Sequence, residues 1–392
     1  MSGVLLYDAD LITPEGSIFR GALWSDGHGI IRAAGKLESF SLLPEGIKRL
    51  RLVGKRLLPG LIDVHVHGGY GVNFGTGDIK KDLLKYSEKI VETGVTGYLP
   101  SIYAQTADEL VNMIEGFVKV FEHEEIPGAQ PLGLHLEGPF INPEKKGAFN
   151  PAWLRTPDVE EAQRYLKAGK GWIKQITIAP ELPQATEVAA LFRRAGVVVA
   201  MGHTNTDYAT ACTALNGDYT HVTHTYNAQR GFDHREPGVL GAVLSSDLPT
   251  TELIGDTIHV HPAAMRMLAR CVGPERIVLI TDAIAGAGLP DGEYEMMGYQ
   301  ITVKAGRVTL PNGTLAGSTA KLSECVRNAA QVMQLPYHQV VHMASRNPAR
   351  MLGLADERGS LIAGKRADLT AVDEEGNVKL TLVAGNIVYN QL

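Results

Sequence analysis

The sequence has few of the features that mark secreted or membrane-spanning proteins. Its three cysteines, Cys212, Cys271 and Cys325, are scattered and never spaced as Cys-x-x-Cys, so neither a disulfide framework nor a thiolate zinc site is expected. No apolar run reaches the ~18 residues that a membrane helix needs. The first residues also lack a basic segment followed by an apolar stretch. We therefore expect a cytoplasmic protein with reduced cysteines and no membrane partner.

An excess of charge of one sign is missing as well. The 37 Lys and Arg residues nearly balance the 43 Asp and Glu residues, and neither sign forms a long block. This pattern gives no support to nucleic acid as a partner, so we expect a small molecule instead. A chain of 392 residues can bury a substantial core and suits one large domain with a smaller one.

Most of the chain alternates between two kinds of segment. Short apolar or β-rich runs are separated by stretches of helical period, which predicts βα units and a parallel sheet. Eight such runs occur, at residues 61–65, 94–99, 131–137, 174–179, 197–201, 219–223, 252–258 and 276–280. Eight parallel strands close a (β/α)8 TIM barrel of roughly 250 residues. We therefore predict an α/β protein with this barrel over residues 57–356.

Strand-like segments with glycine turns occupy the two ends of the chain. Neither end could bury a core alone, so residues 1–56 and 357–392 are predicted to pair into one small β-sandwich domain. Within the barrel region, residues 299–304 and 307–310 alternate with period two around a glycine turn. This pattern predicts a β-hairpin insertion near residues 294–315.

Two histidines lie on the first predicted strand. His65 and His67 are two residues apart, so their side chains share one face, and Gly68-Gly69 ends the strand directly after them. The two imidazoles should therefore lie together at the carboxyl end of this strand. A His-x-His pair alone could equally be two hydrogen-bonded structural histidines.

Other candidate ligands occur at the same end of other strands. Glu137 closes the third run, His203 follows the fifth, His224 closes the sixth and Asp282 follows the eighth. The carboxyl ends of barrel strands converge on the active site, and buried charges without partners are costly. These residues therefore indicate a divalent metal centre. Histidine and carboxylate ligands suit zinc, which we expect first, and also iron, manganese or cobalt.

Three neighbouring residues have other interpretations. His135 lies one layer deeper than Glu137 on the same face, so we expect it to support the centre rather than to bind metal. His221 is three residues before His224 and should face the other way on a strand, as a structural residue. Lys174 could bear a carbamate that bridges metals, but it lies near the start of its strand, so Glu137 is the preferred bridge.

Several segments resemble a known family. Residues 58–69, Leu-Pro-Gly-Leu-Ile-Asp-Val-His-Val-His-Gly-Gly, and residues 359–369 look like the opening and closing signatures of the amidohydrolase superfamily. Within it, the ordered segments 133–140, 202–204, 223–228, 235–238 and 315–318 resemble the N-acetylglucosamine-6-phosphate deacetylase family. The resemblance runs essentially end to end, and the ordered set is more specific than any single motif. It implies hydrolysis of the acetamide of N-acetyl-D-glucosamine 6-phosphate.

The resemblance also implies a distribution of metal ligands. Glu137, His203 and His224 would hold one ion, while His65, His67 and Asp282 would hold or border a second, with Glu137 shared. Some members of the family lack the His-x-His pair and keep a single metal. This chain has the pair, so we expect two divalent ions per subunit.

Asp282 is the expected catalytic residue. Amide hydrolysis needs a strong nucleophile at neutral pH, and a metal lowers the pKa of bound water to about 7. The departing nitrogen also needs a proton. As a base, Asp282 would take a proton from that water, and as an acid it would deliver the proton to the amine.

The resemblance implies a set of substrate-binding residues too. Arg235 and His259 would bind the phosphate, since a guanidinium makes paired contacts with phosphate oxygens. The other residues expected to bind substrate are Ala148, Phe149, Asn227, Ala228, Asp256, Leu315, Ala316 and Gly317. Arg235 could instead form a surface salt bridge with Glu236 or Asp233. In this family a residue at the rim reaches in from a second subunit, which predicts a homodimer.

Two departures from the family leave the substrate open. Phe149 occupies a position where other members carry a substrate-contacting histidine, and Thr257-Ile258 replaces Gly-Leu. N-acetylgalactosamine 6-phosphate and the cyclic amides of dihydroorotase-like relatives are alternative substrates. A sugar-phosphate-binding protein with a vestigial site is a further alternative. The full ligand set and an intact Asp282 argue against that last reading.

Overall fold

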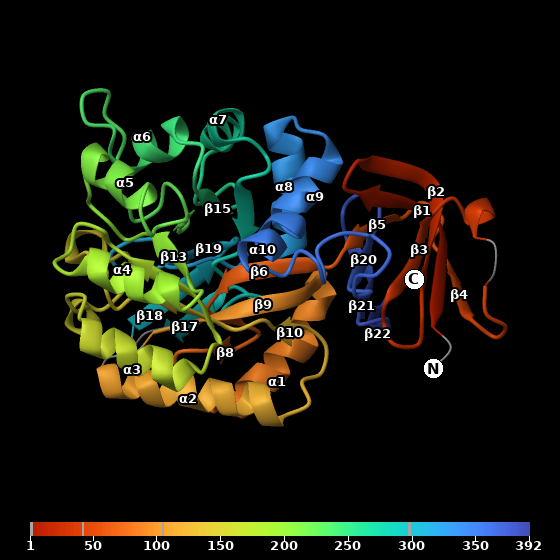
Figure 1. The fold of residues 1–392 in the computed structure, drawn as a ribbon, viewed down its shortest axis with the longest axis horizontal. Coiled ribbons are helices and arrows are strands. Elements are labelled where there is room, and N and C mark those ends of the chain that lie inside the picture. Colours follow the sequence, from red (N-terminus) through yellow and green to blue (C-terminus); the bar gives the residue numbers. More distant parts are fainter. Residues whose placement is uncertain (1–2, 41–42, 104–105, 297–298) are drawn as a thin grey trace.

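The computed structural model describes residues 3–40, 43–103, 106–296 and 299–392. Its larger part is an α/β barrel of parallel strands, as predicted, with helices around the outside (Figure 1). The eight barrel strands are β6 (Leu61–Val66), β9 (Val95–Ile102), β11 (Leu134–Glu137), β12 (Ile173–Ile178), β13 (Val198–Met201), β14 (His221–Val222), β15 (Thr250–Ile254) and β16 (Ile277–Ile280). Each falls on one of the eight runs of the sequence. A short strand, β10 (Gln130–Pro131), also pairs with β9.

Backbone hydrogen bonds join the last barrel strand to the first. The Asp282 amide donates to the His65 carbonyl at 3.0 Å, and the His67 amide donates to the Ala283 carbonyl at 2.8 Å. Both bonds lie just beyond the carboxyl end of β16 and along β6. They bring His65, His67 and Asp282 to one point on the rim, although more than two hundred residues separate them in sequence.

Strand β6 shows why the barrel interior is polar. Ile62 and Val64 pack with Ala349 in an outer apolar cluster. The alternate positions, Asp63 and His65, therefore face the barrel axis, because successive side chains of a strand point to opposite faces. Both are fully buried.

Helices cover the outside of the barrel. They are α1 (Ile79–Ile90), α2 (Ala107–His123), α3 (Val159–Gly169), α4 (Ala185–Arg194), α5 (Tyr208–Leu215), α6 (Gly238–Ser245), α7 (Pro262–Val272), α8 (Leu322–Met333), α9 (Tyr337–Met343) and α10 (Arg346–Met351). The first turn of α2 is closed by a capping box between Thr106 and Glu109. Its buried residues Leu110, Ile114 and Phe117 recur every three or four positions, so one face packs on the sheet.

Strands from both ends of the chain form a separate sheet. Its members are β1 (Val4–Thr13), β2 (Gly16–Ser25), β3 (Ile31–Gly35), β4 (Lys48–Arg51), β5 (Arg56–Pro59), β20 (Leu369–Val372), β21 (Val378–Val383) and β22 (Asn386–Asn390). This confirms the predicted β unit built from both termini. In Figure 1, β20–β22 lie between the barrel and β1–β3. The Thr370 and Thr381 hydroxyls donate to barrel-side carbonyls at 2.7 and 2.8 Å, which attaches the sheet to the barrel.

A small antiparallel sheet stands over the barrel, in the region where a hairpin was predicted. It consists of β17 (Gly292–Met296), β18 (Tyr299–Lys304) and β19 (Arg307–Thr309), so the insertion has a third strand before the expected pair. Residues 297 and 298 of the predicted hairpin region lie outside the described residues. Ile301 and Val303 of β18 pack with Tyr103 and Phe149, and the insertion therefore covers one side of the barrel mouth.

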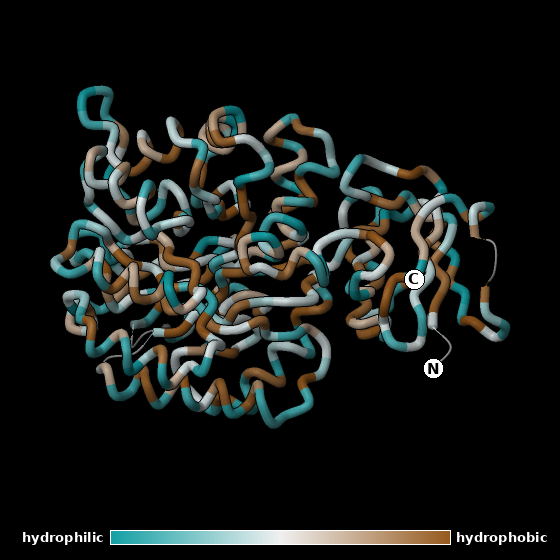
Figure 2. The backbone as a smooth tube through the Cα atoms, in the orientation of Figure 1, coloured by the Kyte–Doolittle hydropathy of each residue, from teal (hydrophilic) through white to brown (hydrophobic). Residues whose placement is uncertain are grey.

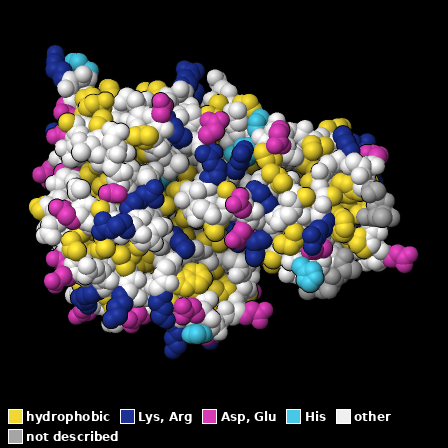
Figure 3. Space-filling view, viewed as in Figure 1, with side chains coloured by type: hydrophobic (Ala, Val, Ile, Leu, Met, Phe, Trp, Pro, Cys, Tyr) yellow, Lys and Arg dark blue, Asp and Glu magenta, His cyan; other side chains and the backbone are white. Residues whose placement is uncertain are grey.

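Short elements complete the fold. They are β7 (Gly68–Gly69), β8 (Val72–Asn73) and the 3-10 turns Leu37–Ser39, Val91–Thr93, Pro143–Lys145 and Pro151–Trp153. Hydrophobic segments run through the barrel wall and the terminal sheet, whereas hydrophilic stretches gather in outer loops (Figure 2). On the face drawn in Figure 3, acidic and basic side chains are interspersed. Among the described residues, no helix is both long enough and apolar enough to span a bilayer.

Gly202 gives a test of how tightly the strand ends are packed. A Cβ atom at this position would lie 2.6 Å from Thr223 Cβ and 2.8 Å from Thr177 Cγ2. We expect Gly202→Ala to lower the free energy of unfolding by about 1–3 kcal/mol, the usual cost of overpacking. Chemical denaturation would measure this loss.

Gly231→Ala is the matched control, because nothing lies within 4 Å of a Cβ there. It should change stability by less than about 1 kcal/mol. Equal effects of the two substitutions would show that the packing around Gly202 is not tight.

Candidate metal centre

A cavity of about 280 Å³ opens at the carboxyl ends of the barrel strands. Its walls include His67, Glu137, His203, His224 and Asp282. A larger cavity of about 410 Å³ lies beyond Tyr103 and contains none of these side chains. The smaller cavity is therefore the candidate site.

Three candidate ligands directly follow strands that end abruptly. His203, His224 and Asp282 follow β13, β14 and β16 with φ angles of 47°, 25° and 51°. Left-handed backbone costs a non-glycine residue about 1–2 kcal/mol. Strain of this kind clusters at functional sites, where the surrounding fold holds it in place. Here it turns each side chain away from the strand direction and toward the cavity.

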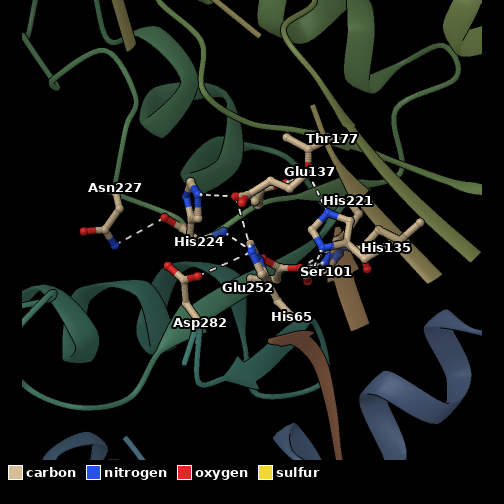
Figure 4. Close-up of polar contacts among 12 residues, drawn as sticks. His65, Ser101, His135, Glu137, Thr177, His221, His224, Asn227, Glu252 and Asp282 are labelled. Atoms are coloured by element: carbon tan, nitrogen blue, oxygen red, sulfur yellow. Dashed lines mark hydrogen bonds and ion pairs between the residues drawn. The ribbon is translucent and has the colours of Figure 1, made fainter. Parts of the chain in front are cut away.

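Glu137 lies at the centre of the candidate ligands. Its Oε1 atom is 3.1 Å from His224 Nε2, 3.2 Å from His203 Nε2 and 3.3 Å from His65 Nε2. Its Oε2 atom is 2.9 Å from His67 Nε2. Figure 4 shows Glu137 between His224 and His65. One carboxylate thus contacts four imidazoles that come from three different strands, β6, β13 and β14.

Three of these imidazoles are oriented by bonds at their other nitrogen. Each Nδ1 atom contacts an acceptor that carries no proton: Glu252 Oε2 at 2.9 Å for His65, the Ser101 carbonyl at 3.1 Å for His67, and the Lys145 carbonyl at 2.8 Å for His203. Each Nδ1 must therefore be the donor. In the neutral form, each Nε2 then presents a lone pair to the cavity.

These lone pairs point at carboxylate oxygens, which are also acceptors. Two acceptors facing each other at about 3 Å repel unless a cation lies between them. His65 Nε2 is buried and makes no hydrogen bond with any residue that the structure describes. The arrangement therefore fits a metal ion, with neutral imidazole and carboxylate ligands of the kind that divalent metals prefer.

Two groups of ligand atoms are close enough to hold an ion. His65, His67 and Asp282 form one, and Glu137, His203 and His224 form the other, with ligand atoms within 4.8 Å of one another in each. Asp282 Oδ1 lies 3.5 Å from His65 Nε2 and 3.4 Å from His67 Nε2. The structure thus brings together all six residues that the sequence singled out as metal ligands.

Electrostatics in the centre favour added positive charge. Burial opposes ionisation of Glu137, but the charge of His65 and hydrogen bonds from His203 and His224 hold the pKa of this carboxyl well below its usual range. Burial likewise disfavours a charged imidazole at His65. The carboxylates of Glu137, Glu252 and Asp282 nevertheless raise the pKa of His65 well above its ordinary value. The carboxylates of the centre therefore favour positive charge beside them.

His135 and Lys174 lie away from the cavity. His135 Nδ1 contacts Ser101 Oγ at 2.8 Å and its Nε2 contacts Thr177 Oγ1 at 2.9 Å, so neither nitrogen is left for a metal. Burial, with the charge of His65, holds the pKa of His135 well below its ordinary value. Lys174 Nζ donates to the Gly171 carbonyl, near the start of β12.

The orientation expected for His221 was wrong. Its Nε2 lies 3.2 Å from Glu252 Oε1 inside the barrel, on the same side as the centre. Strand β14 has only two residues, and the backbone turns before His224, so the alternation rule does not extend across the three-residue spacing. His221 is still not among the ligand groups.

Most of the predicted substrate residues line the cavity. Those that do are Ala148, Phe149, Asn227, Ala228, His259, Leu315, Ala316 and Gly317. Asp256 does not line it and lies behind His259, with Oδ2 2.6 Å from His259 Nδ1. Arg235 does not line it either and is exposed. Within the described residues its guanidinium forms no ion pair with Asp233 or Glu236, the alternative considered from sequence.

Phe149 borders both the metal ligands and the aromatic wall of the cavity. Its ring lies edge-on to His203 at 5.3 Å between centroids, and edge-on to Tyr103 at 5.8 Å. The side chain is buried. A histidine at this position would offer a hydrogen bond, whereas Phe149 offers only apolar surface to a ligand.

Glu252 is a residue of the centre that sequence reasoning did not single out. It lies on β15, is fully buried and contacts His65 directly. The available signal was an ionisable residue in an apolar strand run, Glu252-Leu253-Ile254, where a charge needs a partner.

A family comparison supports this geometry. Residues 56–388 match the model of the amidohydrolase family. A curated relative from Bacillus subtilis (strain 168), N-acetylglucosamine-6-phosphate deacetylase, is 39% identical over 342 residues, which cover 85% of this chain and 84% of the relative. N-acetylgalactosamine-6-phosphate deacetylase from Escherichia coli O157:H7 is 33% identical over 96% of this chain and 97% of its own.

Solved structures agree with the relatives. A mutant N-acetyl-D-glucosamine-6-phosphate deacetylase from Mycobacterium smegmatis, in complex with N-acetyl-D-glucosamine-6-phosphate, matches with a TM-score of 0.90 and 34% identity. The match covers 100% of both chains. The similarity therefore includes both the barrel and the terminal sheet.

Glu137 contacts histidines of both ligand groups, and this predicts the effect of removing its charge. Glu137→Gln keeps the size of the side chain but leaves a neutral group against four imidazoles, so retention of divalent metal should fall at both ligand groups. Elemental analysis after gel filtration would measure the metal per chain.

Lys174→Ala serves as the control, because Lys174 was the alternative bridge and lies away from the cavity. It should retain the metal content of the unmutated chain. Loss of metal from Lys174→Ala, with full retention in Glu137→Gln, would contradict the assignment of Glu137 as the bridge.

Proposed function

Because the chain belongs to the amidohydrolase family, we propose that it is a metal-dependent deacetylase. It hydrolyses the acetamide of N-acetyl-D-glucosamine 6-phosphate to glucosamine 6-phosphate and acetate. The observation that carries this proposal is Glu137, which contacts four imidazoles at the base of a cavity with Asp282 on its edge. Relatives with this activity, at 39% and 36% identity over 85% of the chain, support the substrate.

The two ligand groups support a proposed place for each ion. His203, His224 and Glu137 would hold one ion, and His65, His67 and Asp282 a second, with Glu137 shared. Zinc is the proposed ion, with iron, manganese or cobalt as alternatives that the same ligands accept. When bound, such an ion lowers the pKa of water and polarises the acetyl carbonyl.

Asp282 moves the proton. Its side chain is 13% exposed, so one carboxylate oxygen can face the cavity while the other lies near His65 and His67. It takes a proton from the attacking water and delivers this proton to the amide nitrogen as the C–N bond breaks. The backbone around it is held rigidly, because the Asp282 amide donates to the His65 carbonyl and its carbonyl accepts from the Ser318 amide at 2.8 Å.

His259 and Arg235 bind the phosphate in this proposal. The carboxylate of Asp256 accepts a hydrogen bond from His259 Nδ1, which leaves Nε2 free to face the cavity. Asp256 thus orients a phosphate ligand rather than touching substrate itself. Arg235 is exposed outside the cavity of its own chain, and this position suits a residue that completes the site of a second subunit.

Three further predictions complete the proposal. The chain would be divided into a barrel domain over residues 57–356 and a small β-sandwich domain from residues 1–56 and 357–392. It would form a homodimer and act in the cytoplasm. These statements rest on the sequence and on the proposed role of Arg235.

The activity can be tested by acetate release. The unmutated protein, loaded with zinc, should release acetate from N-acetylglucosamine 6-phosphate. Asp282→Asn removes the proton acceptor and should lower kcat by about 10²–10⁴-fold, the usual contribution of a general acid–base group. Elemental analysis and calorimetry should show that the variant still binds substrate and the ion held by Glu137, His203 and His224.

N-acetylgalactosamine 6-phosphate is the matched substrate, because a relative named for that activity is 33% identical over nearly the whole chain. A higher kcat/KM for the galacto substrate would replace the gluco assignment. No acetate from either compound, with metal bound, would refute the deacetylase proposal.

Arg235→Ala tests the phosphate assignment. Loss of a charge-assisted contact worth about 1.5–3 kcal/mol should raise KM for the phosphorylated sugar by about tenfold or more. Turnover of unphosphorylated N-acetylglucosamine should change little. Arg194→Ala, an exposed arginine of α4, is the control and should leave both substrates unaffected. An unchanged KM in Arg235→Ala would remove Arg235 from the site.

A further inference from the structure

Glu252 occupies an unusual position inside the barrel. It is fully buried on β15, and its two oxygens accept four hydrogen bonds. Oε2 accepts from His65 Nδ1 at 2.9 Å and from the His224 amide at 2.9 Å. Oε1 accepts from Gln175 Nε2 at 2.7 Å and contacts His221 Nε2 at 3.2 Å. Figure 4 shows Glu252 beneath the centre.

One oxygen of Glu252 therefore reaches both ligand groups. The bond to His65 Nδ1 fixes the tautomer and ring orientation of a ligand in the first group. The bond to the His224 amide holds the backbone of a ligand in the second group, at the residue where φ is 25°. Glu137 also contacts both histidines, but at their Nε2 atoms, whereas Glu252 contacts His65 at Nδ1 and His224 at its backbone amide.

The support of His65 differs from that of the other oriented ligands. His67 and His203 are oriented by backbone carbonyls, those of Ser101 and Lys145, which no side-chain substitution removes. His65 is oriented by a side chain. The orientation of His65 therefore depends on the identity of the side chain at position 252.

We propose that Glu252 is a positioning residue of the metal centre, which sets retention of the ion at His65, His67 and Asp282. The inference rests on the proposed function, because it concerns the same site. Glu252 touches neither substrate nor the reacting atoms. It acts through His65, whose Nδ1 it binds so that Nε2 is aimed at the cavity, and through the His224 backbone.

The first test is the metal content of Glu252→Gln. Glutamine keeps the shape of the side chain, but its NH₂ group cannot accept a hydrogen bond. It therefore cannot replace a carboxylate oxygen that accepts hydrogen bonds from neighbouring donors. We expect one ion per chain instead of two after gel filtration, and about 10–100-fold weaker binding of the second ion in competition with a chelator. The absorption spectrum of the cobalt-loaded protein should change as well. The kcat value should fall with less than about threefold change in KM, since the phosphate contacts remain.

Thr250→Val is the matched control. The Thr250 hydroxyl contacts His221 Nδ1 at 2.7 Å, so this substitution disturbs the same buried network one bond farther from Glu252. It should lower thermal stability yet retain two ions and the cobalt spectrum. A purely structural role for Glu252 would give both variants the same result, and that result overturns the proposal.

Two outcomes separate this inference from the proposed function. If the unmutated protein releases acetate while Glu252→Gln binds both ions with unchanged affinity and spectrum, the role of Glu252 is refuted and the function stands. If Glu252→Gln loses an ion while the unmutated protein releases no acetate, the function is refuted and the role of Glu252 stands. If Glu252→Gln fails to fold, Glu252→Asp is the second variant, because it shortens the side chain by one methylene and moves the carboxylate away from His65. Unchanged affinity of Glu252→Asp for both ions would also overturn the proposal.

Discussion

The contact of four imidazoles with the Glu137 carboxylate is the constraint on which the rest of the structure depends. His65, His67 and His203 each donate from Nδ1 to an outer acceptor, so each directs a lone pair at an oxygen that also carries lone pairs. Such a cluster is stable only when a cation neutralises it. The remainder of the barrel interior must then hold the ligands in place without supplying that cation itself.

The polar interior of the barrel follows from this constraint. Ordinary barrels fill their interior with branched apolar side chains. Here the layer below the centre contains Gln175, His221 and Glu252, each within hydrogen-bond distance of a neighbour, because an unpaired buried polar group would cost about 1–3 kcal/mol. The apolar packing that stabilises the barrel is displaced to the outer faces of the strands, against the helices. The outer faces of the strands thus stabilise the barrel, and the inner faces of the same strands form the site.

Much of this architecture could be predicted from sequence because two strong regularities apply. Each barrel strand is a short apolar run between helical segments, and carboxyl ends of barrel strands converge, so ligands at those ends meet. The predicted orientation of His221 was wrong because β14 ends after two residues and the backbone then turns. The alternation of side chains along a strand therefore does not extend from His221 to His224. Glu252 was missed because a single charge within an apolar run does not reveal its partner. The third strand of the insertion, β17, was not predicted because its short run, Gly292–Met296, contains two glutamates and only two large apolar or aromatic residues.

The cover over the cavity sets the surroundings of the candidate metal ligands. Phe149 packs edge-on against His203, and the insertion strand β18 packs Ile301 and Val303 behind it. Apolar groups so close to the ligands exclude water from one side of the centre, and charge interactions strengthen where water is excluded. Asp282 lines the same cavity, and its side chain is 13% exposed. The carboxylate that we propose accepts and returns the proton therefore shares a cavity with an apolar wall, which strengthens its interaction with any charge bound there.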